Sequence, residues 1–458
     1  MKTKRILSLL ITALIFLTSL CACNLDFLST SSEANDSSYE SNNSSLASDG
    51  SISSESSNTD SSVDVNESSQ ESETPKDSVV SFLACPDNII HPSVFYNAIE
   101  VAARNDGVTP DYSDLHNAKY DFAPIYKNVA DAIKNADVAY INQETLVGGT
   151  SGKIHGYPCF NSPQAIADTV IDLGFDVVNV AHNHMLDSGD TRYLENCNNV
   201  FENKGLEVIG YYPTKESVEN ITVIESNGIK IAFLAYTYST NGIKPPANTS
   251  FVIPYFNKEL VQKQVACAKQ VADVIIVSCH WGYEDTFGVN SEQKEYAKLM
   301  CELGVDVVLG MHPHVIQPME WMTSESSSKT LVVYSLGNFV SGMYGGKNML
   351  AGMLSLNIIK SAETGDVSIE APLFIPTVTH YIKGSKVASN DTGYRDFEIC
   401  YLSDYSADKA LTHGVVNYER SHSPTLVGGG FSKDTLLQTL YKYIPLEFLP
   451  EEYQKTEQ

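Results

Sequence analysis

The run Val305-Asp306-Val307-Val308-Leu309-Gly310-Met311-His312-Pro313-His314 joins an apolar stretch to two histidines that flank a proline. Val305–Leu309 predicts a buried strand, and the histidines follow where that strand should end. One interpretation of His312 and His314 is a structural pair that hydrogen-bonds to the backbone. The other is a pair of metal ligands. The choice depends on which residues end the other predicted strands.

Short β-branched runs alternate with helix-like segments along the chain. The predicted strands are Val79–Cys85, Val138–Asn142, Phe175–Ala181, Ile229–Tyr236, Val274–Cys279, Val305–Leu309 and Leu331–Ser335. The predicted helices include Ile125–Ala136, Pro163–Leu173, Lys258–Ala272 and Glu292–Leu303. This alternation predicts a layered α/β fold with a largely parallel sheet flanked by helices.

The pattern changes from about Ala351, where few helices separate the strand-like runs. We predict strands over Gly352–Ile358, Val367–Ile369 and Phe397–Leu402, and a helix over Asp434–Tyr443. The C-terminal portion is therefore expected to be rich in strands.

The charge of the chain is strongly negative and unevenly distributed. The formal net charge is -26, which argues against nucleic acid as a partner. Residues 24–78 hold 12 acidic residues, one basic residue and 20 serines. Such a segment cannot bury enough apolar surface to offset its ordering entropy, so we expect a disordered tether.

The N-terminus has the features of an export signal. Basic residues precede an apolar run, Ile6–Leu20, that is too short for a comfortable membrane span. Leu20-Cys21-Ala22-Cys23 resembles a bacterial lipobox, with Cys23 as the lipidated residue. An ordinary signal peptide is the alternative, but the Ser- and acid-rich spacer favours a lipoprotein on the outer face of the cytoplasmic membrane. Cys85 and Cys279 lie in apolar strands and are expected to be buried thiols.

Ligand-type side chains follow five of the predicted strands. In chain order, these residues are Asp87 and His91, then Glu144, then Asn183, His184 and Asp187, then His280 and Glu284, and finally His312 and His314. The carboxyl ends of parallel strands form one edge of a sheet, so these groups should converge there. A mixed set of imidazoles, carboxylates and an amide suits Mn, Fe or Zn, and it exceeds what one ion needs. The sequence therefore predicts two divalent first-row metal ions.

These residues lie in blocks that resemble the CapA family of capsule and poly-gamma-glutamate synthesis proteins, whose fold is similar to that of calcineurin-like metallophosphoesterases. The blocks, in family order, are PDNIIH, INQET, GFDVVNVAHNHMLDSG, HWGYE, GVDVVLGMHPHVIQPME and YSLGNFVSG. One departure is Pro86, where the family usually has glycine before Asp87. Proline fixes φ and lacks an N–H, so the geometry of this first turn is open.

The resemblance implies a role for each residue. Asp87, His91 and His314 would hold one metal, Asn183, His280 and His312 the second, and Glu144 would bridge them. His184 would protonate the leaving group. Asp187 and Glu284 would fix imidazole tautomers, and Asn142 and Asn338 would touch substrate or bound water.

Several of these residues have a structural alternative. His91 could cap a helix that begins at Pro92, and Asp187 could be a turn residue before Ser188-Gly189. The remaining histidines are expected to be structural, and they are His182, His116, His155, His380, His413 and His422.

The chain thus divides into a signal peptide (1–23), a tether (24–78), a CapA-like metallophosphoesterase-fold domain (79–360) and a C-terminal extension packed on it (361–458). We expect a surface-anchored, two-metal hydrolase acting on a phosphoester or on a cell-envelope polymer. The alternative is a non-catalytic capsule assembly factor that binds an anionic polymer or capsule synthase subunits. The complete ligand set favours the enzyme.

Overall fold

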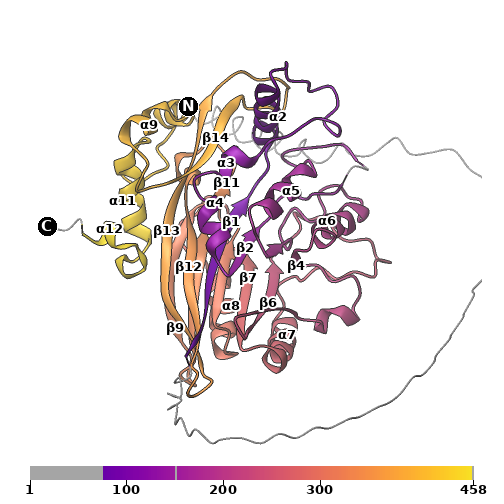
Figure 1. Ribbon diagram of the computed structural model, residues 1–458, viewed down its shortest axis with the longest axis vertical. Coiled ribbons are helices and arrows are strands. Elements are labelled where there is room, and N and C mark those ends of the chain that lie inside the picture. Colours follow the sequence, from indigo (N-terminus) through magenta and orange to yellow (C-terminus); the bar gives the residue numbers. More distant parts are fainter. Residues whose placement is uncertain (1–75, 150–151, 456–458) are drawn as a thin grey trace, which may run out of the picture. The chain divides into compact units, whose positions relative to one another are not determined.

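The computed structural model describes residues 76–149 and 152–455, whose strands form two sheets (Figure 1). The predicted signal peptide and nearly all of the predicted tether lie outside these residues. Within them, no helix is both long and apolar enough to cross a bilayer.

The first sheet has eight strands in the order β14-β13-β12-β1-β2-β3-β4, and β11 also pairs with β1. Its strands are β1 (Ser78–Asn88), β2 (Val138–Asn142), β3 (Val177–Asn179), β4 (Glu207–Ile209), β11 (Asn338–Val340), β12 (Leu350–Lys360), β13 (Val367–Lys383) and β14 (Tyr394–Tyr401). Strands β1 to β4 run parallel, whereas β12 to β14 continue the sheet from β1 in antiparallel pairs.

The second sheet has six strands in the order β5-β6-β7-β8-β10-β9. Its strands are β5 (Thr222–Ser226), β6 (Ile229–Thr237), β7 (Val274–His280), β8 (Val307–Met311), β9 (Ile316–Thr323) and β10 (Lys329–Leu336). The four central strands are parallel, and β5 and β9 form antiparallel edges. The layered α/β fold and its strand-rich C-terminal portion are confirmed. The expected parallel strands divide between these two sheets.

Helices cover the outer faces of the sheets. They are α2 (Pro92–Asp106), α3 (Ala123–Tyr126), α4 (Ala130–Asn135), α5 (Ala165–Asp172), α6 (Arg192–Glu202), α7 (Lys258–Val271), α8 (Ser291–Glu302), α9 (Ala407–Thr412), α10 (Val416–Ser421), α11 (Lys433–Tyr443) and α12 (Glu451–Gln454), with 3-10 turns η1 (Glu216–Glu219), η2 (Gly346–Met349) and η3 (Leu446–Phe448). In Figure 1 the C-terminal helices (yellow) lie on one side of the strands, and α5 and α6 lie on the other.

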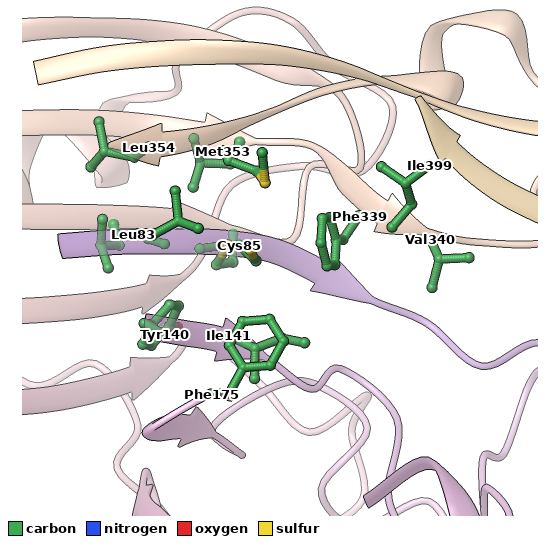
Figure 2. Close-up of a cluster of buried hydrophobic side chains, with 14 of the residues drawn as sticks. Leu83, Cys85, Tyr140, Ile141, Phe175, Phe339, Val340, Met353, Leu354 and Ile399 are labelled. Carbon is green, nitrogen blue, oxygen red and sulfur yellow. The ribbon is translucent and has the colours of Figure 1, made fainter. Parts of the chain in front are cut away.

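The main core lies between the two sheets. Phe82 of β1 and Phe233 of β6 have ring centroids 6.2 Å apart, and Tyr140 of β2 hydrogen-bonds to Ser278 of β7. Alternate residues of β6 point the other way, so Leu234 packs with α7 and α8 in a second cluster. Figure 2 shows side chains of β1, among them Cys85, between those of β12 and β2. Cys85 and Cys279 are fully buried, as predicted, and burial raises the pKa of both thiols well above the usual range.

An aspartate precedes each of four parallel strands and fixes its register against the neighbouring strand. Asp137, Asp176, Asp273 and Asp306 accept the backbone N–H of Ser81, Ala139, Lys230 and Ile275, respectively. Each aspartate also donates its own N–H to the carbonyl of the same partner residue. The repeated Asp-Val dipeptide therefore aligns the starts of the strands, and hence their carboxyl ends.

Asp306→Asn is expected to stabilise the protein in a pH-dependent way. Burial raises the pKa of Asp306 to about 6, so between about pH 4 and pH 6 the folded chain keeps a proton that the unfolded chain has lost. Wild-type stability therefore falls over this range. Ionising the partly buried carboxyl should lower the free energy of unfolding by about 2 kcal/mol, somewhat less than the energy that corresponds to a shift of two pKa units in a fully buried group. Asparagine still accepts the N–H of Ile275. Chemical denaturation should therefore show that the free energy of unfolding of the variant, relative to that of wild type, increases by about 2 kcal/mol from pH 4 to pH 7. A pH-independent difference would contradict this.

Three elements depart most clearly from the sequence expectation. β3 is only three residues long, because the chain after Asn179 turns into the His182–His184 segment. The predicted helix Ile125–Ala136 is divided into α3 and α4. β13 extends to Lys383, far beyond Ile369, because it pairs with β12 along its first part and with β14 along its last part.

Candidate metal centre

The carboxyl ends of the parallel strands meet between the two sheets and bring most of the predicted ligands together. Three groups of described side chains have potential ligand atoms within 4.8 Å of one another, and two of these groups share Glu144. One of the two is Asp87, Glu144 and His314, and the other is Glu144, His280 and His312. Glu144 belongs to both, which is the arrangement expected of a carboxylate between two ions.

Glu144 is a buried carboxylate with an unusual environment. Its side chain is fully buried, and neither oxygen has a hydrogen-bond partner among the described residues. Its Oε1 lies 3.7 Å from His280 Nε2 and 3.6 Å from His314 Nε2. Burial, followed by the nearby charge of Asp87, raises the pKa of Glu144 well above its usual range. A cation would remove this electrostatic cost.

A chain of asparagines positions Asp87 at the end of β1. The Asn142 side-chain amide donates to Asp87 Oδ1 at 2.7 Å, and Asn179 Nδ2 donates to Asn142 Oδ1 at 2.7 Å. The other Asp87 oxygen accepts the backbone N–H of His312. Asn142 therefore orients a candidate ligand and is fully buried.

Pro86 is accommodated by an irregularity in strand pairing. Cys85 pairs with Ile141, and Asp87 pairs with the next residue, Asn142, so Pro86 is an extra residue between them. A bulge leaves this residue without a ladder hydrogen bond, which suits a residue that has no N–H. The proline thus leaves Asp87 at the strand end.

Asn183 lies beside the second group. Its Oδ1 is 2.9 Å from His280 Nε2, and its Nδ2 donates to Asn241. Ligand atoms around one first-row ion lie about 3 Å apart, because each is about 2.1 Å from the metal. Asn183 Oδ1 and His280 Nε2 have this spacing, and Glu144 Oε1 lies 3.7 Å from the same nitrogen. Asn241, which the sequence did not single out, holds the amide in this orientation.

His312 and His314 do not form the extended pair that their position after a strand suggests. Their φ angles are +94° and +57°, so both residues are in left-handed conformations. The rings are 5.7 Å apart between centroids, and each imidazole belongs to a different group around Glu144. The separation of the two imidazoles therefore comes from a tight turn of the backbone.

The histidines differ in their protonation. Burial, then the neighbouring imidazoles, lowers the pKa of His280 and of His312 well below the usual value. Burial also disfavours the charged form of His314, but a hydrogen bond to Asp87 and its charge outweigh this and raise its pKa. His314 Nδ1 is also 3.0 Å from Asn338 Oδ1. Asn338, like Asn142, is fully buried and contacts a candidate ligand.

His184 is held at the rim of the centre and belongs to neither group. Its Nδ1 lies 2.6 Å from Asp187 Oδ2, and that oxygen also accepts the N–H of Phe160. The Phe160 ring packs edge-on against the imidazole at 4.8 Å. Asn241 Nδ2 approaches the same Nδ1 at 3.4 Å. This arrangement fixes the ring and directs Nε2 away from Asp187.

His91 lies outside both groups. It occupies the N-cap position of α2, but its side chain makes no capping hydrogen bond, so the capping alternative is wrong. Its Nδ1 accepts the backbone N–H of Gly342 at 3.1 Å. Burial, then the charge of His314, lowers the pKa of His91 to about 3. The structure places a neutral imidazole near the site without bringing it into ligand distance.

Two neighbouring residues approach the centre more closely than we had expected. Glu284 is exposed, and its carboxylate lies within 4.8 Å of nitrogens of His312 and His314. The Tyr238 ring packs on His312 at 4.6 Å. His182, expected to be structural, is fully buried, and its Nδ1 accepts the N–H of His184. Tyr238 carried no sequence signal, because it lies outside the five strand ends.

The C-terminal region contacts the site through η2. Asn348 donates to the carbonyl of His314 at 3.1 Å and to Asp285 Oδ1 at 2.8 Å. Glu419 of α10 accepts the N–H of Gly346 and both donors of Thr425. Residues beyond 360 therefore help to fix the turn that carries His314.

The donor set fits a pair of divalent ions. Within residues 76–149 and 152–455, both oxygens of Glu144 and Nδ1 of His312 are buried without hydrogen-bond partners. Unpaired buried polar atoms are costly unless a ligand satisfies them. Neutral imidazoles with carboxylates are also the donors that first-row ions prefer. The geometry therefore supports a metal centre at this edge of the strands.

Two solved structures of limited similarity can be compared with this fold. The NAD nucleotidase of Haemophilus influenzae aligns with a TM-score of 0.41 and 14% identity, covering 83% of this chain and 59% of that one. The calcineurin-like phosphoesterase YfkN of Bacillus subtilis aligns with a TM-score of 0.38 and 14% identity, covering 70% of this chain and 94% of that one. These likenesses are too weak to carry an argument about activity.

Sequence comparison is more informative. The PGA biosynthesis protein CapA of Bacillus subtilis is 33% identical over 171 residues, which are 37% of this chain and 43% of that protein. The capsule biosynthesis protein CapA of Bacillus anthracis is 28% identical over 235 residues, covering 48% and 54% of the two chains. The chain thus spans about half the length of these curated relatives. Residues 87–343, just over half of the chain, match the sequence model described as bacterial capsule synthesis protein PGA_cap, and the chain belongs to that family.

Proposed function

We propose that the protein is a two-metal hydrolase that acts on a phosphoester or related bond of a cell-envelope polymer. The observation that carries the proposal is Glu144, a buried carboxylate with two unpaired oxygens that is shared by two groups of ligands. A non-catalytic assembly factor has no need for this shared, unpaired carboxylate. The curated relatives are named for capsule and PGA biosynthesis, which supports a polymer substrate and capsule synthase subunits as partners.

The residues of the chain divide the chemical work. Two ions held by these groups would supply Lewis-acid activation of water and stabilise developing negative charge. Asn142 and the N–H of His312 orient Asp87, and Asn338 orients His314, so the ligands are fixed before substrate binds. His184 donates a proton to the leaving oxygen, because Asp187 holds its Nδ1 and leaves Nε2 free to act.

The full chain, purified after supplementation with Mn, Fe or Zn, should contain about two ions and hydrolyse a generic phosphodiester. Elemental analysis gives the ion content, and release of a chromogenic leaving group gives turnover. A chain that carries two ions but hydrolyses neither diesters nor acyl substrates would support the assembly-factor alternative. A chain that stays metal-free would contradict the proposal itself.

We also propose that Cys23 anchors the protein to the outer face of the cytoplasmic membrane. The support is the lipobox-like sequence before Cys23 and the acidic, Ser-rich segment after it. Mass spectrometry of the mature N-terminus should show diacylated Cys23, and Cys23→Ser should release the protein from the membrane fraction. An unmodified terminus at any other residue would sink this prediction.

A further inference from the structure

We propose that Glu284 determines the charge of the reacting group that the centre accepts. Its carboxylate lies within 4.8 Å of nitrogens on His312 and His314, and it is the exposed acidic residue in these groups. Because the two histidines belong to different groups around Glu144, Glu284 lies beside both groups and is exposed to solvent. The inference rests on the proposed two-metal function and names its substrate class, which is a phosphodiester or acyl centre in preference to a phosphomonoester.

The position of Glu284 is fixed by its loop. At one end of the loop, the backbone N–H of Trp281 donates to the carbonyl oxygen of Met311. At the other end, the backbone N–H of Asp285 donates to the carbonyl oxygen of Pro313. The loop is therefore hydrogen-bonded on both sides of the His312 turn. Gly282 has a φ of +93°, and a Cβ there would meet the Gln293 side chain at 3.0 Å, so the tight path excludes larger residues.

A second set of contacts ties the same loop to His314. Asn348 bridges Asp285 Oδ1 and the His314 carbonyl, and the Lys347 ammonium is 2.8 Å from the Asp285 carbonyl. Lys347 is also 3.4 Å from the Asp285 carboxylate. The ammonium group of Lys347 therefore pairs with Asp285, and the structure shows no contact between Lys347 and Glu284.

Glu284 would affect anion binding by changing the net charge of the metal centre. Two divalent ions with Asp87 and Glu144 would leave a centre with two net positive charges, and Glu284 would reduce this to one. An exposed carboxylate about 5 Å from a bound anion, with screening intermediate between bulk water and a protein surface, weakens binding by roughly tenfold for each negative charge on the anion. A dianionic monoester therefore loses more affinity than a singly charged diester or a neutral acyl group. Tyr238, packed on His312, provides an uncharged wall beside it.

Glu284→Gln should shift the preference of the full chain loaded with metal toward dianions. Calorimetric titration at about pH 8 would compare inorganic phosphate, mostly dianionic there, with singly charged dimethyl phosphate. We expect the variant to bind phosphate roughly a hundredfold more tightly than wild type and dimethyl phosphate roughly tenfold more tightly. Glu302→Gln is the matched control, because α8 runs back from this edge and places Glu302 at the opposite edge of the sheet. It should change neither affinity.

The outcomes separate this inference from the proposed function. Equal gains for the two ligands, or no gain, would overturn the role of Glu284. Loss of an ion from Glu284→Gln, measured by elemental analysis, would overturn it by showing that Glu284 is a ligand. A wild-type chain that holds two ions and hydrolyses nothing would contradict the proposed function only, because the binding comparison still decides the inference. A metal-free wild-type chain would overturn both.

Discussion

Glu144→Gln should reduce the metal content from about two ions to one or none and lower turnover by about a thousandfold or more. Glu144 is the residue common to the group with Asp87 and His314 and the group with His280 and His312, so its replacement weakens both sites at once. Glutamine has similar shape but no charge, and two divalent ions close together need a bridging anion. Elemental analysis and phosphodiester hydrolysis by the same preparation would measure the two effects.

Stability separates this effect from unfolding. In the metal-free protein the pKa of Glu144 is raised, so the folded chain loses stability as the pH rises above about 4.5. Glutamine removes this loss, and the metal-free variant should be at least as stable as metal-free wild type at pH 7. Glu398→Gln is the control, because β14 lies four strands from β2 in the sheet. It should keep two ions. A Glu144→Gln protein that also keeps two ions would refute the bridging role.

The sequence predicted most strands because each is a compact β-branched run. Val138–Asn142 is predicted to the residue, and Asp-Val marks the start of this strand and three others. Assignment to two sheets could not be predicted, because it depends on contacts such as Phe82 with Phe233, about 150 residues apart. The length of β13 was also missed, because its later part is stabilised by pairing with β14.

The candidate site was predictable to the extent that it follows strand ends. Asp87, Glu144, Asn183, His280, His312 and His314 converge, as the α/β pattern indicates. The residues that orient them were less visible. Asn179 lies inside a strand, and Asn241 and Asn348 lie in loops whose contacts form only in three dimensions. His91 is the opposite case. It follows a strand end as the other candidate ligands do, but it immediately precedes α2, and its Nδ1 accepts the N–H of Gly342.

His184→Ala and His312→Ala should separate proton donation from metal binding. His312 belongs to two of the ligand groups, whereas His184 belongs to none of them and is held by Asp187. His312→Ala should therefore lower metal content and turnover together. His184→Ala should keep nearly all of the metal and lower turnover by about a hundredfold, the usual contribution of a general acid. Parallel elemental analysis and kinetics would measure both variants.

The leaving group gives this comparison its decisive control. A substrate whose leaving group departs as a stable anion needs no proton, so it should recover much of the activity lost in His184→Ala and little of that lost in His312→Ala. Asp187→Asn should resemble a milder His184→Ala, because asparagine still accepts the Phe160 N–H but no longer stabilises a charged imidazole. Equal metal loss in both histidine variants would make His184 a ligand. Absence of rescue, with metal intact, would leave His184 a positioning role and assign the proton to another donor.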